Sequence, residues 1–593
     1  MVKTIFFVLV IVICFPLSTW GQGHIPDWAK DAVWYQIFPE RFRNGDLTND
    51  PTRKELQLGA ERDWEISPWT SDWYQFQPWE AAYSKDFYNN VFERRYGGDM
   101  QGIIDKLDYL AGLGVTAIYL NPVFEAYSLH KYDASTYHHI DNNFGPDARG
   151  DLELMAKEDK DAGKWQFSAA DKLFLKLIRQ AHKRGIRIII DGVFNHSGTR
   201  FWAFQDVVKN QQKSRYADWF DVTKWDDPAT PDNEFDYKGW WGYKALPEFR
   251  EDPNGLVKGP RDYFFNVTRR WMDPDGDGDP NDGVDGWRLD VANEVSPRFW
   301  KQWRKLVKSI NPQAYIVGEI WDDASKWLAG DQFDAVMNYR FARAAVRFFI
   351  DTGQKRYQVS DFAKQLAGVR SVYPVEVNYG LQNLYDSHDT DRLSSMIINK
   401  NRGYDKNASP RQNPSYNLRK PNPQEIRIQK LMVLFQMTYL GAPMIYYGDE
   451  AGMWGADDPD DRKPMLWADL KYDNERSHPI PGQSRPNDTV TFNQDLYEYY
   501  RQLIRIRKSN IALRRGSFYD LLSDDEKGVY AFGRKTKDNH VIVVLNNDAA
   551  AQTISLPLDG AFQDQVSGNE LTGDGEGLKL RLDAKSGVIL VKQ

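Results

Sequence analysis

The sequence contains almost no cysteine. Its single cysteine, Cys14, lies in an N-terminal segment, residues 1–22, that reads as an export signal. Lys3 precedes an apolar run over 5–15, and small residues lead to a cleavage point after Gly21. The mature chain would then hold no thiol, which excludes disulfides and cysteine catalysis and fits an oxidising compartment, periplasmic or extracellular. An uncleaved anchor is the alternative, although the run is shorter than the roughly 20 residues that a membrane span needs.

The sequence also lacks an excess of positive charge. Lys and Arg number 76 against 84 Asp and Glu, which gives a net charge of −8. Nucleic acid is therefore not an expected partner, and neither is a membrane beyond the export signal, because no basic surplus is available to neutralise phosphates. No internal repeat or low-complexity linker is present. A neutral substrate fits the charge balance better.

Aromatic and apolar residues are plentiful. The chain is 41% hydrophobic, enough for a sizeable core, and contains 21 Trp and 31 Tyr. Most of these aromatic rings are expected to pack in the core, but their faces also suit sugar rings.

A short strand-like segment over 283–291 presents Arg288 and Asp290 two residues apart. Alternate residues of a strand share a face, so both side chains would reach one pocket at the end of the strand. An Arg beside an Asp favours the ionised carboxylate that a nucleophile needs. The alternative for this pair alone is a surface ion pair.

Two more acids, Glu319 at the end of an apolar run and Asp389 in the segment 384–389, lie at intervals that suit a βα repeat. Glu319 lies 29 residues after Asp290, about one βα unit, and Asp389 lies 70 residues after Glu319, about two units. The three acids would then meet at the carboxyl ends of strands in one parallel barrel, where barrel enzymes place their chemistry.

Four ordered motifs resemble the signature regions of the α-amylase family of glycoside hydrolases. Within that family the sequence is most similar to the neopullulanase and cyclomaltodextrinase branch, from about Trp34 to the C-terminus. The motifs span residues 191–196, 286–290, 318–321 and 387–389.

The resemblance implies a (β/α)8 TIM barrel with a subdomain inserted after the third strand and a C-terminal antiparallel β-sandwich. The 88 residues from His196 to Val284 are too many for one crossover, which independently predicts the insertion. The expected divisions are the signal 1–22, the first barrel part 23–196, the insertion 197–262, the second barrel part 263–511 and the β domain 512–593.

The resemblance also assigns roles to the acids. Asp290 would be the nucleophile, Glu319 the general acid and base, and Asp389 a group that binds sugar hydroxyls in the distorted ring. The substrate would be an α-glucan: a cyclodextrin, a maltooligosaccharide, pullulan or starch. Substrate-binding residues carried over from the family are His130, Tyr132, His196, Arg288, Trp321, His388, Asp458 and Arg462.

Two acidic loops are candidate calcium sites. Residues 44–50 bring together short oxygen-bearing side chains, which a hard cation prefers, although such a loop alone is more often a solvated turn. In the related branch this loop and a later Gly-Gly-Asp bind calcium, which implies Asn44, Asp46, Asn49, Asp50, the carbonyl of Gly97, and Asp99. A second loop has alternating aspartates but no final bidentate Glu, so an acidic turn is the alternative; its candidate ligands are Asp273, Asp275, Asp277 and Asp282.

Two departures from the branch leave the substrate open. Glu248 stands where relatives usually have Lys. The first barrel strand begins about ten residues after the export signal, so we expect no preceding β domain of the kind that pairs subunits, and we expect a monomer with an open cleft. The alternatives to hydrolysis are a transglycosylase acting on the same substrates and an inactive oligosaccharide-binding protein.

Overall fold

The computed structural model describes residues 25–53, 56 and 63–593. The export signal predicted at 1–22 and Cys14 lie outside these residues. Among the helices of the described part, none is both long enough and apolar enough to cross a membrane.

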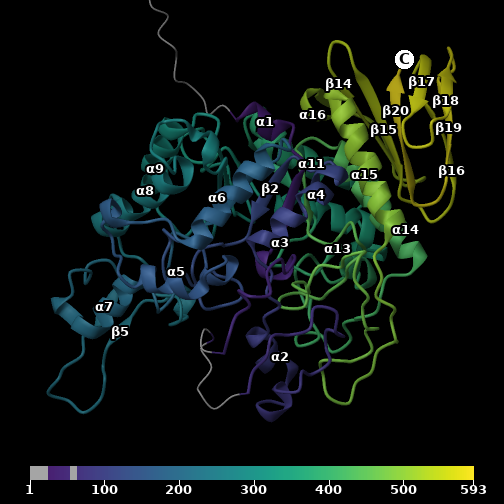
Figure 1. Ribbon diagram of the computed structural model, residues 1–593. Helices are drawn as coiled ribbons and strands as arrows, with labels where there is room; N and C mark the ends of the chain where they lie inside the picture. The colour runs from purple at the N-terminus through teal and green to yellow at the C-terminus, as the bar shows by residue number, and fades with distance from the viewer. Residues whose placement is uncertain (1–24, 54–55, 57–62) are drawn as a thin grey trace, which may run out of the picture.

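Eight parallel strands form a barrel at the centre of the molecule (Figure 1). The strand order is β10-β9-β8-β3-β2-β1-β12-β11, and a parallel bridge from Met337 to Gln382 joins the two ends. Every strand residue except Arg187 is buried, which accounts for the nearly continuous apolar runs of the sequence. The strands are β1 (Trp34–Ile37), β2 (Ala117–Leu120), β3 (Arg187–Gly192), β8 (Gly286–Leu289), β9 (Tyr315–Gly318), β10 (Ala335–Val336), β11 (Gln382–Asn383) and β12 (Ala442–Tyr446).

Amphipathic helices surround the barrel, and α6 (Ala169–His182) shows how the sequence defines them. Ser168 and Asp171 form a capping box at its start, Phe174 and Leu177 lie on its buried face, and Gly185 takes a positive φ of 69° just beyond its end. The other main helices are α3 (Met100–Asp105), α4 (Leu107–Leu113), α8 (Lys258–Met272), α9 (Pro297–Ile310), α10 (Tyr339–Ala345), α11 (Val359–Val372), α13 (Leu393–Ile398), α14 (Pro423–Thr438), α15 (Gln494–Ser509) and α16 (Ile511–Arg515).

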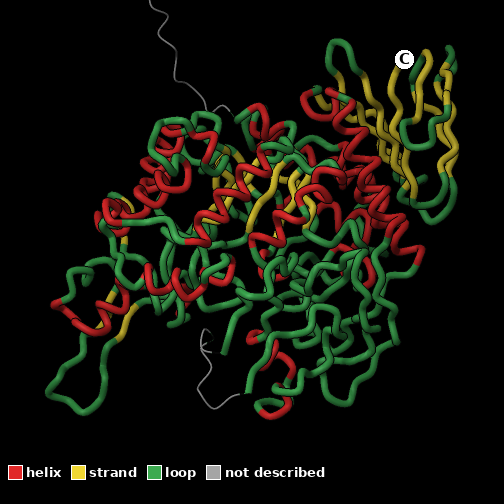
Figure 2. Tube along the Cα trace, viewed as in Figure 1, coloured by secondary structure: helices red, strands yellow, loops and turns green. Residues whose placement is uncertain are grey.

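Long connections gather at one end of the barrel, where the strands finish. Figure 2 shows loops dominating the lower half of the molecule, around α2 (Phe87–Asn90), α5 (Ala148–Met155) and α7 (Trp202–Asn210). These helices follow β1, β2 and β3 respectively, so the loops cover the carboxyl ends of the strands. The segment between β3 and β8 projects farthest, with two small sheets built from β4 (Val222–Lys224), β5 (Asp236–Tyr237), β6 (Glu251–Asp252) and β7 (Gly255–Leu256).

The C-terminal region forms two antiparallel sheets, at the upper right of Figure 1. The larger has the order β13-β14-β15-β20-β17-β18 and the smaller pairs β16 with β19. One apolar cluster fills the space between the sheets, while the other face of β14 and β15 joins the main core of the barrel. The strands are β13 (Ser517–Asp524), β14 (Val529–Lys535), β15 (His540–Asn546), β16 (Gln552–Leu556), β17 (Gly560–Asp564), β18 (Glu570–Gly573), β19 (Leu578–Leu582) and β20 (Ser586–Lys592).

Candidate active site

Arg288 on β8 is the centre of the candidate site and is fully buried. Its Nη1 lies 2.8 Å from Asp290 Oδ1, and its Nη2 lies 2.9 Å from Glu319 Oε2. Asp290 follows β8 and Glu319 follows β9, the neighbouring strand, so strand pairing brings the two acids to one guanidinium. The structure therefore places together the Arg and the two acids that the sequence predicted.

Asp191 at the end of β3 completes this ion cluster. Both of its carboxylate oxygens lie 3.0 Å from Arg288 Nη1, and Oδ2 also accepts hydrogen bonds from the hydroxyls of Tyr119 and Tyr132. The sequence places Asp191 in a motif but assigns it no role. In the structure, Asp191 holds the guanidinium of Arg288 in place and connects it to Tyr132, a predicted substrate-binding residue.

The sequence also did not predict the backbone geometry of Val291, the residue that follows Asp290. Val291 has a φ of +37°, a left-handed conformation that a β-branched residue rarely adopts. Its N–H donates to Glu319 Oε2 at 3.0 Å, and the indole N–H of Trp321 donates to Oε1 at 3.0 Å. The unusual turn thus helps to hold Glu319 in place. Trp321 itself stacks on Tyr339 with ring centres 3.9 Å apart.

Asp389 lies on the same side of the barrel with a free carboxylate oxygen. Its Oδ1 is 3.2 Å from His388 Nε2 and 3.8 Å from Arg462 Nη2, whereas the buried Oδ2 has no hydrogen-bond partner among the described residues. A buried oxygen without a partner is costly in a folded protein unless a ligand supplies the donor. This position suits a group that receives sugar hydroxyls.

The carboxyls of this site titrate as a cluster. Burial raises the pKa of Asp290 well above its usual range; Arg288 lowers it, and Glu319 and Asp191 raise it further. Burial likewise raises the pKa of Asp389 to about 7, with Glu319 adding to the effect. The expectation that Arg288 keeps Asp290 ionised is therefore incomplete, because one guanidinium is shared among three carboxylates. Asp290 and Asp389 therefore hold their protons to a higher pH than ordinary aspartates do.

The predicted substrate-binding histidines, His130, His196 and His388, are buried or half-buried neutral rings. His388 stacks on Tyr132 at 5.4 Å, its Nδ1 contacts Gln36, and burial lowers its pKa. Burial also lowers the pKa of His130 and that of His196, the latter to about 4. His196 Nε2 is buried and has no partner within the described chain. Neutral imidazoles suit hydrogen bonding to uncharged hydroxyls.

Asp458 and Arg462 close one edge of the site. Arg462 Nη1 lies 2.9 Å from Asp458 Oδ1, and its Nε and Nη2 donate to the carbonyl of His388 at 2.8 and 2.6 Å. Arg288, Trp321, His388 and Arg462 each contact one of the three acids directly. Tyr132 and Asp458 are connected to Asp389 through His388 and Arg462, and His130 is connected through Tyr132. His196 instead contacts Trp240 and Glu248 of the inserted segment.

The loop over 44–50 folds against Gly97 and Asp99 as a candidate cation site. The Oδ1 atoms of Asn44 and Asn49 are buried without partners among the described residues. Gly97 has a φ of +75°, and a Cβ there would lie 2.0 Å from Asp50 Oδ1, so only glycine lets the carboxylate approach. These oxygens fit a hard cation such as Ca²⁺. Asp46 instead accepts hydrogen bonds from Thr48.

The second acidic loop also brings its predicted ligands together. Carboxylate oxygens of Asp273, Asp275 and Asp277 lie within 4.8 Å of one another. Asp273 Oδ1 and Asp282 Oδ1 are buried and lack partners in the described chain. Burial raises the pKa of Asp282, and the other three aspartates raise it further, which places all four near one another. This donor set fits calcium as well.

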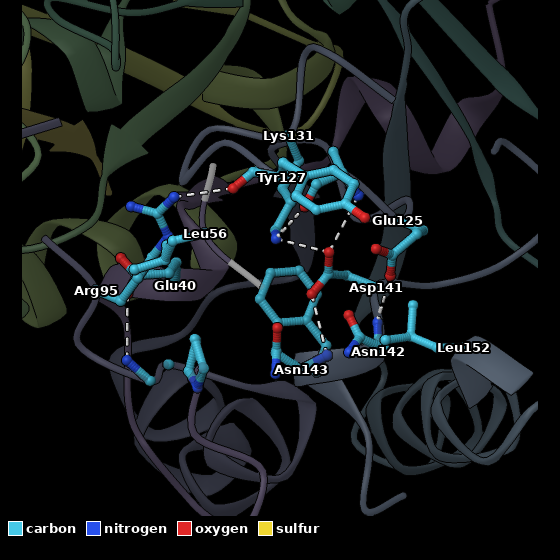
Figure 3. Close-up of a pocket in the computed structure, with 15 residues that line it drawn as sticks. Glu40, Leu56, Arg95, Glu125, Tyr127, Lys131, Asp141, Asn142, Asn143 and Leu152 are labelled. Atoms are coloured by element: carbon cyan, nitrogen blue, oxygen red, sulfur yellow. Dashed lines mark hydrogen bonds and ion pairs between the residues drawn. The ribbon is translucent and has the colours of Figure 1, made fainter. Parts of the chain in front are cut away.

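A pocket lies between Pro51 and Gly97, which border the first loop, and the loop that carries Tyr132 (Figure 3). Lys131 points into it, with Nζ 2.6 Å from Asp141 Oδ2 and 2.9 Å from the carbonyl of Ala126. Asn143 Nδ2 donates to the carbonyl of Asn49 at 3.1 Å, across the pocket. The cation loop and the substrate loop are therefore one connected structure.

A third group of possible ligands is satisfied by protein contacts. His138, His139 and Glu158 bring their N and O atoms within 4.8 Å. His139 Nδ1 lies 2.8 Å from Asp171 and its Nε2 2.8 Å from Glu158, so the ring bridges two carboxylates. Burial lowers the pKa of His139, but the two carboxylates raise it by more. We interpret this group as an ion-pair cluster that fastens the segment around Glu158 to α6.

Comparisons with known proteins agree with this geometry. The model of the α-amylase catalytic domain matches residues 36–163 and 165–516, and that of the maltogenic amylase C-terminal domain matches 519–589. Neopullulanase 2 of Thermoactinomyces vulgaris is 40% identical over 570 residues, which cover 95% of this chain and 78% of that protein. A cyclomaltodextrinase of Geobacillus thermopakistaniensis is 38% identical over 563 residues, 95% of this chain and 76% of that one.

Solved structures show the same relationship. A cyclomaltodextrinase superposes with a TM-score of 0.70 at 33% identity, over 96% of this chain and 79% of that one. The cyclic α-maltosyl-(1→6)-maltose hydrolase of Arthrobacter globiformis, in complex with cyclic α-maltosyl-(1→6)-maltose, gives a TM-score of 0.69 at 27% identity, over 96% of this chain and 100% of that one. The predicted barrel and C-terminal β domain are confirmed, and the chain belongs to the α-amylase family of glycoside hydrolases.

Proposed function

We propose that this protein is a retaining α-glucan hydrolase that cleaves α-1,4-glucosidic bonds in cyclodextrins, maltooligosaccharides, pullulan or starch. The observation that carries the proposal is the shared contact of Asp290 and Glu319 with Arg288, beside an Asp389 carboxylate with a free oxygen. Retaining glycosidases need two acids close together, one as nucleophile and one as proton donor.

In the first step, an Asp290 oxygen attacks C1 of the glucose unit. The bond from C1 to the leaving sugar breaks, and Glu319 gives its proton to the departing oxygen. Asp389 accepts hydrogen bonds from hydroxyls of the same ring.

In the second step, Glu319 takes a proton from water and the water oxygen attacks C1, which frees Asp290 and releases a sugar of the original anomeric configuration. A sugar hydroxyl in place of water would give transfer instead of hydrolysis. Product analysis on cyclodextrin, pullulan and starch separates these outcomes and identifies the substrate.

We also propose that Ca²⁺ binds the protein at two places and stabilises its loops. The first site would use Asn44, Asn49, Asp50, Asp99 and the Gly97 carbonyl, with Asp46 turning inward; the second would use the aspartates of residues 273–282. The support is the set of buried oxygens without partners in the described chain. Calcium would supply the positive charge that these acids lack.

The catalytic proposal is tested by removing each acid separately. Asp290→Asn and Glu319→Gln should each lower kcat on maltotriose by at least roughly 10³-fold, because each abolishes one half of the mechanism. The leaving group of α-glucosyl fluoride is fluoride, which departs without protonation. With this substrate the Glu319→Gln variant should accumulate a covalent adduct on Asp290, visible by peptide mass spectrometry.

The matched control is Asp322→Asn, an exposed acid three residues after Glu319 whose side chain is 82% accessible. It should keep wild-type turnover. Retention of near-wild-type rates by either catalytic variant, or an adduct on another residue, would overturn the assignment.

A further inference from the structure

The tip of the inserted segment exposes large aromatic rings to solvent. The side chains of Trp241 and Tyr243 are 74% and 62% exposed. Trp240, half-buried, stacks on Trp241 with ring centres 5.0 Å apart and lies 6.5 Å from Tyr243. Contiguous exposed aromatic surface of this kind marks a binding site in soluble proteins. We refer to Trp240, Trp241 and Tyr243 as the aromatic tip.

The backbone at the aromatic tip is strained as well. Trp241 has φ 48° and ψ 26°, the left-handed conformation that favours glycine, and Gly242 follows with φ 87°. Trp241 therefore contributes little buried apolar area, and no relaxed backbone, to the folded state. A residue that costs stability in both respects points to a role in function.

The aromatic tip is attached directly to the active site. Trp240 stacks on His196 with ring centres 5.5 Å apart and planes inclined by 25°. His196 pairs with Glu248 in an antiparallel bridge, and Trp240 N–H donates to the Leu246 carbonyl at 2.9 Å. Ring faces thus form a row from buried His196 through Trp240 to exposed Trp241, on a backbone held to the end of β3.

We infer that the aromatic tip is a binding platform for a glucose unit of an α-glucan outside the cleaved position, with Trp241 as the principal stacking surface. The inference rests on the proposed function, because the row of rings is continuous with the site where cleavage would occur. The flat apolar faces of pyranose rings match flat aromatic faces, and a neutral sugar needs no charged partner. The platform would then determine how strongly the enzyme prefers long chains.

The test uses Trp241→Gly, which removes the ring and suits the local backbone. For maltoheptaose, kcat/KM should fall about tenfold, through KM with kcat unchanged, which corresponds to about 1.4 kcal/mol of lost binding. Turnover of α-glucosyl fluoride, which occupies only the cleaved position, should stay within twofold of wild type. The melting temperature should stay the same or rise, because glycine relieves the strained φ.

Phe92→Ala is the matched control, since it removes a ring that is 39% exposed elsewhere on the surface. This variant should keep wild-type kinetics on both substrates. Equal loss on both substrates, or a lower melting temperature in Trp241→Gly, would show that Trp241 is structural. Unchanged maltoheptaose kinetics would overturn the platform.

Calorimetric titration of maltoheptaose into Glu319→Gln, with and without Trp241→Gly, separates this inference from the proposed function. About tenfold weaker binding in the double variant supports the platform even if the wild type proves inactive. Equal binding contradicts it. An inactive wild type with intact folding would contradict only the proposed function.

Discussion

At the scale of single residues, the three acids of the candidate site could be picked out because short motifs contain them. Asp290 and Glu319 follow β8 and β9, which pair directly, and Asp389 follows β11. Asp191 and Val291 could not be given roles in the same way. The role of Asp191 depends on Arg288, 97 residues later in the chain. The positive φ of Val291 runs against the preference of its residue type, so no propensity argument would assign it.

Asp389 carries the clearest pH prediction. Its pKa is raised in the folded protein, by burial first and by Glu319 second, to about 7, from an ordinary value near 3.8. The folded state therefore binds a proton more tightly than the unfolded state. The contribution of Asp389 to stability is fully present below pH 3.8 and is lost as the pH rises towards 7.

Asp389→Asn should remove the loss of stability that ionisation of Asp389 causes at high pH. We expect the variant to melt a few degrees above the wild type at pH 8, with little difference at pH 4, because an amide does not ionise. Thermal unfolding at both pH values measures this. A variant that is less stable than the wild type at pH 8 would show that ionised Asp389 does not destabilise the folded protein. Activity should fall in either case, since the same buried charge is proposed to bind substrate.

At the scale of elements, long periodic segments carry a readable signal in the sequence and short ones do not. The helical spacing of apolar residues in α6 (Ala169–His182), with Ser168 as its cap, and the apolar run of β3 (Arg187–Gly192) are both visible in the sequence. β10 and β11 have two residues each, too short for a pattern. The Trp-rich stretch over 64–88 had no readable motif; its Trp73 and Phe87 pack with Tyr416, far away in sequence.

The loop over 44–50, the first proposed calcium site, is the element with the sharpest test. A chelator should lower the melting temperature of the wild type by several degrees, because a ligand at 100 times its Kd stabilises the folded state by about 2.7 kcal/mol. Chelation should also raise KM, since Asn49 and Asn143 tie this loop to the loop that carries Tyr132.

Variants identify which loop responds. Asp50→Ala should lose most of the sensitivity to chelator, whereas Asp275→Ala, in the second loop, should keep it and keep its KM. If the reverse holds, the second loop is the principal site. If chelation changes neither melting nor KM after prolonged incubation, both loops are ordinary turns.

At the scale of the whole molecule, the sequence predicted the order of domains but not how tightly they are joined. Along β15, Val541, Val543 and Leu545 belong to the main core of the barrel, whereas Ile542 and Val544 face the interior of the β domain. Alternate side chains of this one strand therefore pack into two different cores. Buried Arg534 on β14 adds hydrogen bonds to the carbonyls of Leu513 and Gly516, at 2.9 and 3.1 Å.

This shared strand predicts that the barrel and the β domain unfold together. Val544→Ala opens space only in the core of the β domain, far along the chain from every catalytic residue, and should cost roughly 1–3 kcal/mol. Catalytic activity should nevertheless be lost at the same lowered temperature as β-domain structure, in a single calorimetric transition, because the barrel core ends on the other face of the same strand. Val543→Ala, its neighbour on the barrel side, should shift that transition similarly. Two separate transitions, with activity surviving the first, would show that the barrel keeps its site without the β domain and that the common core is not energetically shared.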